Sequence, residues 1–424
     1  MTKATNSDRP AASPSWLPIG NLHYGWVIAS LGVLVSMCVL GIARFAFGML
    51  LPSMGEGLAL SYGQMGTIST ANFIGYLLGA LLCSRIMSRT GARQLITIAL
   101  AAIFATLALI AFSSNFWQVL TLFTITGLGS GTGNVAMVGL VSHWFQRSLR
   151  GRAAGLVVSG SGFAIMLSGV LIPAINNRYG PDGWRYGWIA LAGVVALVAL
   201  VVAVLMRSDP ADVGLKPAGE EGATAPTQAP IARAQARRAT WHLGLIYVAF
   251  GFSYVIYVTF IVTTLVDDRG FSESTAGWFW FAVGFFSIFS GPIFGSLSDR
   301  VGRRLGLAAV FGMHITAYLL VGIVLPTPFL YLSVFLFGLS AWSIPGIVGA
   351  AAGDYLGPSQ AVHALGILTV FFGVGQAVGP AVSGVLADRT GSFDSSFLLA
   401  AALSVVGAVL SLLLKPPSEA ARHS

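Results

Sequence analysis

Long runs of apolar residues alternate with short polar or Gly/Pro-containing segments along the whole chain. Runs of about 20 apolar residues are typical of helices that cross a lipid bilayer. The pattern predicts six spans in the first half, near 24–52, 64–84, 95–113, 117–143, 153–174 and 185–206. It predicts six more in the second half, near 242–266, 275–296, 305–325, 328–352, 362–387 and 395–414. We therefore expect an all-α integral membrane protein with twelve transmembrane helices.

The apolar pattern is interrupted in the middle of the chain. The interrupting segment contains Asp209-Pro210, Glu220-Glu221 and several Ala, Pro and Arg residues, a composition typical of linkers. The predicted organisation is a tail at 1–23, a six-helix bundle at 24–206, a linker at 207–241, a second bundle at 242–414 and a tail at 415–424.

The basic residues predict the orientation of the spans. Of the 23 Lys and Arg residues, 18 fall in the two tails, the linker and the connections on the same side as these. Only Arg178, Arg185, Arg269 and Arg389 fall on the opposite side. Because positive charge accumulates on the cytoplasmic side, both termini and the linker are expected to be cytoplasmic.

Composition narrows the class further. Hydrophobic residues make up 55% of the 424 positions and charged residues only 9%, against about 25% charged in typical soluble domains. The net charge of +8 lies mostly in loops, so we expect no nucleic-acid partner. Cys38 and Cys83 both lie inside predicted spans, which argues against a disulfide framework or a cysteine zinc site.

The sequence shows no constellation that predicts catalysis. It has no metal-ligand cluster, no phosphate-binding loop for ATP and no Ser/His/Asp set at one depth. We therefore predict a protein that is not an enzyme, without catalytic residues, cofactor or metal.

Arg44 lies inside the first predicted span, within Gly41-Ile42-Ala43-Arg44-Phe45. A buried arginine there costs about 2.5–3.5 kcal/mol on the insertion scale, so a compensating partner is expected. None of the 15 acidic residues lies well inside a predicted span. Our central hypothesis is that an anionic ligand compensates Arg44. The alternatives are a gating role, or a side chain that reaches the headgroups or bonds backbone carbonyls.

An internal repeat joins the two halves. Ser88-Arg89-Thr90-Gly91-Ala92-Arg93 is matched 211 residues later by Asp299-Arg300-Val301-Gly302-Arg303-Arg304. Asn177-Arg178-Tyr179-Gly180 is matched at the same offset by Asp388-Arg389-Thr390-Gly391. Two matches at one offset indicate two parallel repeats, an arrangement that places a substrate site between the halves near the bilayer midplane.

The second copy of this loop, from Gly295 through Asp299 to Arg304, resembles the major facilitator superfamily signature G-x-x-x-D-R-x-G-R-R. The first copy departs from it, with Ser84, Ser88 and Ala92 in place of the Gly, the acid and an Arg. The resemblance implies the major facilitator fold and a loop that holds the cytoplasmic side closed through Asp299. The implied gating residues are Arg89, Gly91, Arg93, Asp299, Arg300, Gly302 and Arg303.

Three further stretches resemble monocarboxylate and organic-anion porters: His23-Tyr24-Gly25-Trp26-Val27, His143 to Leu156, and Gly183-Trp184-Arg185. The segment around Arg44 also resembles a bacterial branch of the superfamily, which implies a bacterial inner membrane. One departure matters. The porters usually carry a substrate arginine in the eighth span, but 278–296 contains no basic residue. Arg44 would have to supply the charge.

The other candidate residues are polar side chains inside predicted spans. The 211-residue offset carries Arg44 to Val255, which lies between Tyr254 and Tyr257. The predicted substrate-binding residues are Arg44, Asn72, Tyr76, Asn134, Tyr247, Tyr254, Tyr257 and Gln376. Trp342 also lies at membrane depth. For each of these, packing or hydrogen bonding between helices is the alternative interpretation.

These patterns together predict a secondary active transporter that works by alternating access, as a monomer in a lipid bilayer. The predicted substrate is a small organic anion, with a monocarboxylate as the best guess. If H⁺ is the coupling ion in symport, His314 is the candidate carrier, since it is the only histidine well inside a span. The alternatives are an exporter of drug-like or neutral metabolites with an aromatic pocket, a non-transporting receptor on the same fold and, third, an intramembrane enzyme.

Overall fold

The computed structural model describes residues 23–219 and 233–415, and this part of the chain is helical with short connections. Residues 1–22 and 416–424 of the predicted tails and residues 220–232 of the predicted linker lie outside the described residues. The helices of the first half are α1 (Tyr24–Ser36), η1 (Met37–Phe45), α2 (Ala46–Gly57), α3 (Tyr62–Thr90), α4 (Ala92–Ile110), α5 (Phe116–Trp144), α6 (Arg147–Val158), α7 (Gly160–Tyr179), η2 (Gly180–Asp182) and α8 (Gly183–Leu205). After η3 (Pro210–Val213), those of the second half are α9 (Arg233–Thr263), η4 (Thr264–Asp268), α10 (Glu273–Val301), α11 (Arg303–Gly322), α12 (Pro328–Ser340), α13 (Ser343–Thr390) and α14 (Asp394–Leu413).

Within the described ranges, ten helical stretches are long and apolar enough to cross a membrane. The stretch Ser148–Leu205 counts once although it contains both α7 and α8, and α5 is not among the ten. The twelve predicted spans are therefore not counted directly. Large apolar side chains such as Leu81 and Leu197, each 63% exposed, stand on the outer surface of the bundle. An apolar lateral surface of this kind suits contact with lipid.

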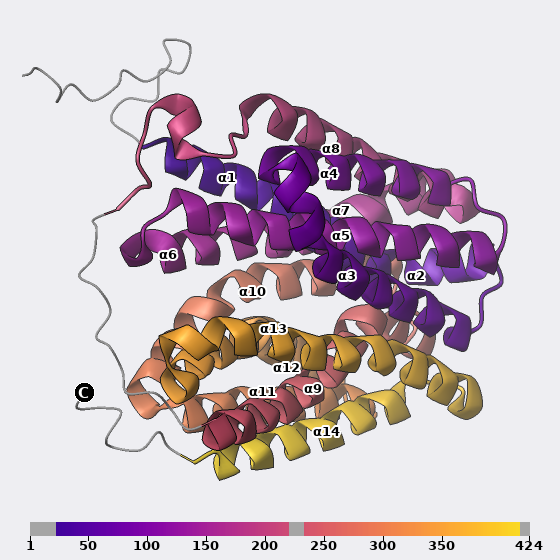
Figure 1. Cartoon of the computed structure of the whole chain (residues 1–424). Coiled ribbons are helices and arrows are strands. Elements are labelled where there is room, and N and C mark those ends of the chain that lie inside the picture. Colours follow the sequence, from indigo (N-terminus) through magenta and orange to yellow (C-terminus); the bar gives the residue numbers. More distant parts are fainter. Residues whose placement is uncertain (1–22, 220–232, 416–424) are drawn as a thin grey trace, which may run out of the picture.

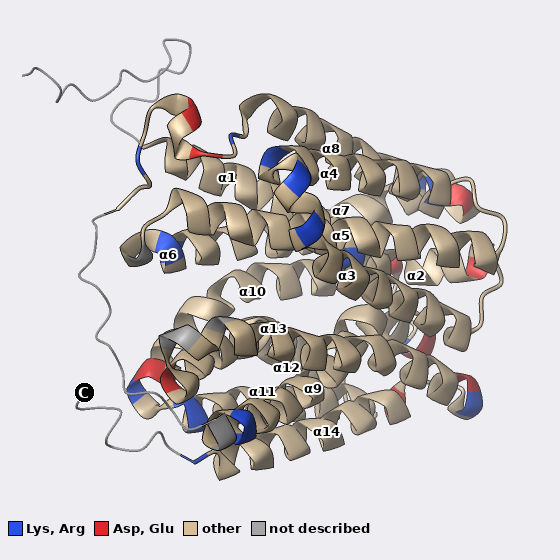
Figure 2. Cartoon of the chain, viewed as in Figure 1, with Lys and Arg blue, Asp and Glu red and all other residues tan. Residues whose placement is uncertain are grey.

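The helices up to α8 lie on one side of the molecule and those from α9 onward on the other (Figure 1). We call these groups the first half and the second half. The end where α1 begins and α8 and α14 finish is the linker end, and the opposite end is the far end (Figure 1). Charged residues gather near the helix ends and leave the middle largely uncharged (Figure 2).

The internal repeat appears in the backbone. Gly91 and Gly302, which end α3 and α10, have φ angles of 78° and 89°. Gly180 and Gly391, which end α7 and α13, have φ angles of 62° and 78°. Positive φ is readily adopted only by glycine. The two matches found in the sequence are thus matched helix endings, 211 residues apart.

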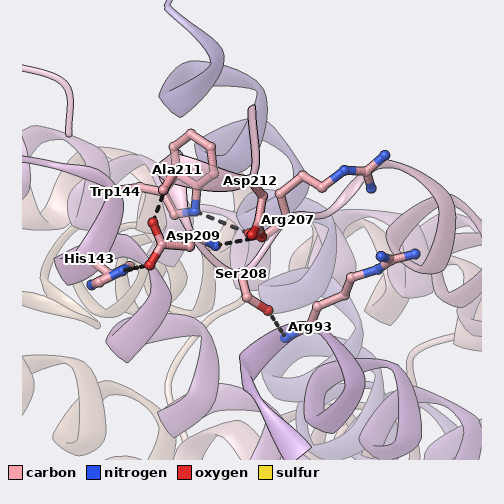
Figure 3. Close-up of polar contacts among 8 residues, drawn as sticks. All are labelled: Arg93, His143, Trp144, Arg207, Ser208, Asp209, Ala211 and Asp212. Carbon is pink, nitrogen blue, oxygen red and sulfur yellow. Dashed lines mark hydrogen bonds and ion pairs between the residues drawn. The ribbon is translucent and has the colours of Figure 1, made fainter. Parts of the chain in front are cut away.

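The first part of the linker is attached to the first half at the linker end (Figure 3). The indole nitrogen of Trp144 donates to the carbonyl of Arg207 over 3.1 Å, and the imidazole of His143 lies 2.8 Å from a carboxylate oxygen of Asp209. The backbone N–H of Arg93 donates to Ser208 Oγ over 3.2 Å. The linker therefore begins as part of the first half.

Candidate functional site

Arg44 lies in η1, a π-helical turn inside the long helix that runs from α1 to α2. Side chains of neighbouring helices bond the carbonyls of this turn: Ser130 Oγ donates to Val39, and Asn72 Nδ2 donates to Ala43 over 3.2 Å. Such turns are frequent at functional sites. Asn72 also donates to Phe123 of α5 over 2.9 Å, so its amide holds the backbone beside Arg44 in place.

The guanidinium of Arg44 is buried, with only 8% of the residue exposed. Its carbon lies 4.4 Å from the centre of the Phe73 ring and 4.3 Å from that of Tyr76. Within the described residues Nε and Nη2 are buried and have no hydrogen-bond partner. Each cation–π contact stabilises the charge by about 0.5–2 kcal/mol, but ring faces do not replace hydrogen-bond acceptors for the N–H groups.

One tyrosine from each half has its hydroxyl fixed near this arginine. Asn134 Nδ2 donates to the Tyr76 hydroxyl over 2.9 Å in the first half. Gln376 Nε2 donates to the Tyr254 hydroxyl in the second half. Tyr254 lies within electrostatic range of both Arg44 and Tyr76. Because each phenol oxygen accepts from an amide, its own proton remains available to another acceptor.

Trp342 closes the site from the second half. It lies in the break between α12 and α13, where Pro345 cannot bond the carbonyl four residues earlier and so interrupts the helix. Its ring stacks on Phe45 with centroids 5.0 Å apart and meets Tyr254 edge-on at 5.8 Å. The indole Nε1 is buried without a hydrogen-bond partner among the described residues, as is Gln376 Oε1.

Other predicted site residues lie around this group or away from it. Tyr247 stacks on Phe372 at 4.4 Å and lies within electrostatic range of Tyr254. Tyr257 instead turns into the second half, where its hydroxyl lies 3.0 Å from Ser333 Oγ. His314, fully buried, is surrounded by aromatic rings of the second half. The structure thus groups Arg44, Tyr76, Asn134, Tyr247, Tyr254 and Gln376, and leaves Asn72, Tyr257 and His314 in packing positions.

Phe73 was not predicted from the sequence, and Trp342 was predicted only as a residue at membrane depth and not among the substrate-binding residues. Phe73 precedes Tyr76 by three residues, so both project from the same side of α3. Trp342 is followed three residues later by a proline inside an apolar run, which marks a helix break. These two signals were available in the sequence.

Two arginines of the predicted gating loop, Arg93 and Arg303, bond within their own half. Arg303 pairs with Asp299, and its Nε lies 2.7 Å from Asp354 of α13. Arg93 donates to the Ala203 carbonyl at the end of α8. Arg89 and Arg300 make no hydrogen bond or ion pair in the described part of the chain.

At the far end, carboxylates of the second half accept hydrogen bonds from the first half. Asp267 accepts from the Tyr62 hydroxyl (3.3 Å), Asp388 from Ser61 Oγ (3.0 Å) and the Gly63 N–H (2.9 Å), and Glu273 from Asn176 Nδ2 (2.6 Å). A cavity of about 420 Å³ is lined by the three carboxylates, by Ser61 and Tyr62, and by Glu56. These contacts were not predicted from the sequence.

Two groups of helices with a buried polar site between them form the architecture of a membrane transporter. The chain belongs to the family described as "Uncharacterised MFS-type transporter YbfB", whose model matches residues 36–412. It is therefore a multi-pass membrane protein of the major facilitator superfamily, a family of transporters and not of enzymes. The predicted family and fold are confirmed.

Similar proteins support this assignment. The chain is 25% identical over 418 residues to the "Probable sulfoacetate transporter SauU" of Cupriavidus necator, covering 91% of this chain and 93% of that protein. It is 27% identical over 411 residues to human "Monocarboxylate transporter 11", covering 91% and 82%. A solved bacterial homologue of the human lysosomal transporter Spinster has the same fold, with a TM-score of 0.72, 14% identity and coverage of 95% and 98%.

Proposed function

We propose that this protein is a secondary active transporter that moves a small organic anion across the membrane by alternating access, with Arg44 binding the carboxylate. The observation that carries the proposal is the pair of buried, unpartnered donors, Nε and Nη2 of Arg44. A carboxylate accepts from two guanidinium N–H groups at once. The names of the sulfoacetate and monocarboxylate relatives support an anionic substrate.

The surroundings of Arg44 fit alternating access. Phe73 and Tyr76 belong to the first half, whereas Trp342 and Tyr254 belong to the second. A ligand held by both groups changes its contacts when one half rocks against the other. By the positive-inside rule, the linker end is cytoplasmic and the far end faces outward across a bacterial inner membrane.

The groups around Arg44 limit the ways in which transport could be coupled to proton movement. Within the described residues Arg44 has no carboxylate partner. Proton symport would therefore use the charge of the anion, His314, or Arg44 released by the substrate, whereas exchange would need none of these.

The test compares the purified full chain with Arg44→Ala and Arg44→Lys against small carboxylates and their neutral amides. A ligand that binds only the folded state raises its melting temperature. Hydrogen bonds to a charged group are worth about 1.5–3 kcal/mol, so we expect Arg44→Ala to weaken carboxylate binding roughly 10- to 150-fold. Uptake into proteoliposomes should fall in parallel.

Arg185→Gln is the matched control. Arg185 donates to the carbonyls of Ala111 and Ser113, each over 2.8 Å, so its loss should lower stability but leave the response to carboxylates intact. Stabilisation by neutral aromatic compounds that is unchanged in Arg44→Ala would overturn the proposal and favour an exporter. Ligand binding without uptake would favour a receptor.

A further inference from the structure

Four buried polar atoms in the site have no partner among the described residues, and they differ in kind. Arg44 Nε and Nη2 and Trp342 Nε1 are donors, whereas Gln376 Oε1 is an acceptor. Buried polar groups in native proteins are nearly always hydrogen-bonded, by protein, water or ligand. A ligand that suits this site therefore presents acceptors to one side and a donor to the other.

These atoms belong to one connected group. Arg44 adjoins Phe45, the Phe45 ring stacks on Trp342, the Trp342 ring meets Tyr254, and Tyr254 accepts from Gln376. The donors of Arg44 come from η1 in the first half, and the acceptor of Gln376 from α13 in the second half. The two poles of the ligand would thus be held by different halves.

A simple carboxylate satisfies only part of this set. Its oxygens accept from Arg44 and Trp342, but it has no hydrogen to donate to Gln376 Oε1. Gln376 is 1% exposed, so little water replaces the missing donor. One N–H of its amide is already used by Tyr254, and the carbonyl oxygen has no partner among the described residues.

We propose that the substrate is a hydroxycarboxylate, whose carboxylate is bound by Arg44 and whose hydroxyl donates to Gln376 Oε1. This inference rests on the proposed function and adds a specificity-determining residue to it. Sites that hydrogen-bond a substrate hydroxyl discriminate strongly against analogues without it, because a buried group of the protein is then left unpaired. The aromatic rings of Phe45, Phe73 and Trp342 would enclose the carbon skeleton between the two poles.

The experiment measures equilibrium binding to the full chain for matched pairs: propionate against 2-hydroxypropionate and 3-hydroxypropionate, and butyrate against 3-hydroxybutyrate. We expect one hydroxylated member to bind at least about ten-fold more tightly than its parent acid. Gln376→Met, which keeps the side-chain length, should abolish this preference, so that the two members of each pair bind with similar affinity. Arg44→Gln should weaken both members of a pair.

The outcomes separate the two proposals. Equal binding of both members to the wild type, lost in Arg44→Gln, would overturn the hydroxycarboxylate inference and keep the anion site. Binding that is indifferent to Arg44→Gln would overturn the anion site as well. The wild-type comparison needs no substitution, so it remains decisive if Gln376→Met does not fold. If folded Gln376→Met still prefers the hydroxylated acids, a residue other than Gln376 binds the hydroxyl, and the assignment of Gln376 is overturned.

Discussion

At the far end the two halves touch through their backbones, and at the linker end they do not. A Cβ added to Gly66 of α3 would lie 2.1 Å from the carbonyl oxygen of Pro380 in α13. A Cβ added to Gly169 of α7 would lie 2.5 Å from the carbonyl oxygen of Gly277 in α10, and one added to Gly277 would lie 2.2 Å from that of Gly169. At the linker end, a Cβ added to Gly291 or Gly349 would meet no atom within 4 Å.

The polar contacts follow the same division. In the described part of the chain, hydrogen bonds between the halves come from the far-end portions of α3, α7, α9, α10 and α13 and from η4. The charged contacts at the linker end, such as Arg303 with Asp354, stay within one half. The difference teaches that in this conformation the two halves are joined at the far end, and that opening the site toward that end, as the proposed function requires, would break these contacts.

The largest expected effect comes from filling the backbone contact. Gly66→Val places side-chain atoms where Pro380 lies, so the far end cannot close and transport should fall on the order of 100-fold. Opening of the far end is measured by labelling a cysteine placed at Met65, which lines the far-end cavity and is only 4% exposed. The Met65→Cys substitution is made in a Cys38→Ala, Cys83→Ala background, so that this cysteine is the one labelled.

Gly291→Val is the matched control for Gly66→Val. It introduces the same side chain into a helix at a position with open space, so transport and labelling should stay near wild type. Wild-type labelling and transport in Gly66→Val would show that closure of the far end is not required.

A smaller effect is expected from the polar contacts. Asp388→Asn keeps an acceptor for Ser61 and Gly63 but removes the charge that strengthens both bonds. Labelling of the Met65→Cys reporter should rise roughly 3- to 10-fold. Asp299→Asn removes a carboxylate that bonds within the second half, and should leave the reporter unchanged. A similar rise in labelling for Asp388→Asn and Asp299→Asn would show that the far-end contacts are not what keeps this end closed.

The smallest effect is expected at the linker. The hydrogen bond from His143 lowers the pKa of Asp209 from its usual 3.8, and the backbone N–H of Ala211 adds to this. A lowered pKa in the folded state stabilises the protein above the unfolded pKa, and this contribution disappears as the pH falls through the folded value. His143→Ala should therefore lower the melting temperature slightly at pH 7, and the difference from wild type should begin to shrink as the pH falls past about 3.8 and vanish below the lowered pKa of Asp209. A difference in melting temperature that persists at lower pH would show that His143 stabilises the protein by packing and not through its hydrogen bond to Asp209.

Much of the fold was predictable from the sequence because membrane spans and charge bias are local properties. Apolar runs gave most helices within a few residues. The span predicted at 328–352, however, contains the break at Trp342, since Pro345 interrupts the helix locally without shortening the apolar run. The repeat was predictable because glycine at a helix end has a local cause, the positive φ.

The candidate site was predictable only in part. Arg44, Tyr76, Tyr254 and Gln376 were singled out as polar groups at membrane depth, and the structure groups them. Which way each side chain faces depends on contacts far apart in sequence. Asn72 could line a cavity or bond backbone, and only the packing of α5 against α3 shows that it bonds Ala43 and Phe123. The far-end carboxylates were missed because each lies at a helix end, where charge is ordinary.

The direction in which the Arg44 side chain points depends on the number of residues in the π-helical turn η1. A π turn holds more residues than an α turn, so α1 and α2 belong to one span but have different rotational phases. Removing one residue between 37 and 45 would turn the following helix by about 100° relative to α1. A one-residue insertion or deletion within this turn would therefore change the direction of Arg44 and alter the candidate site.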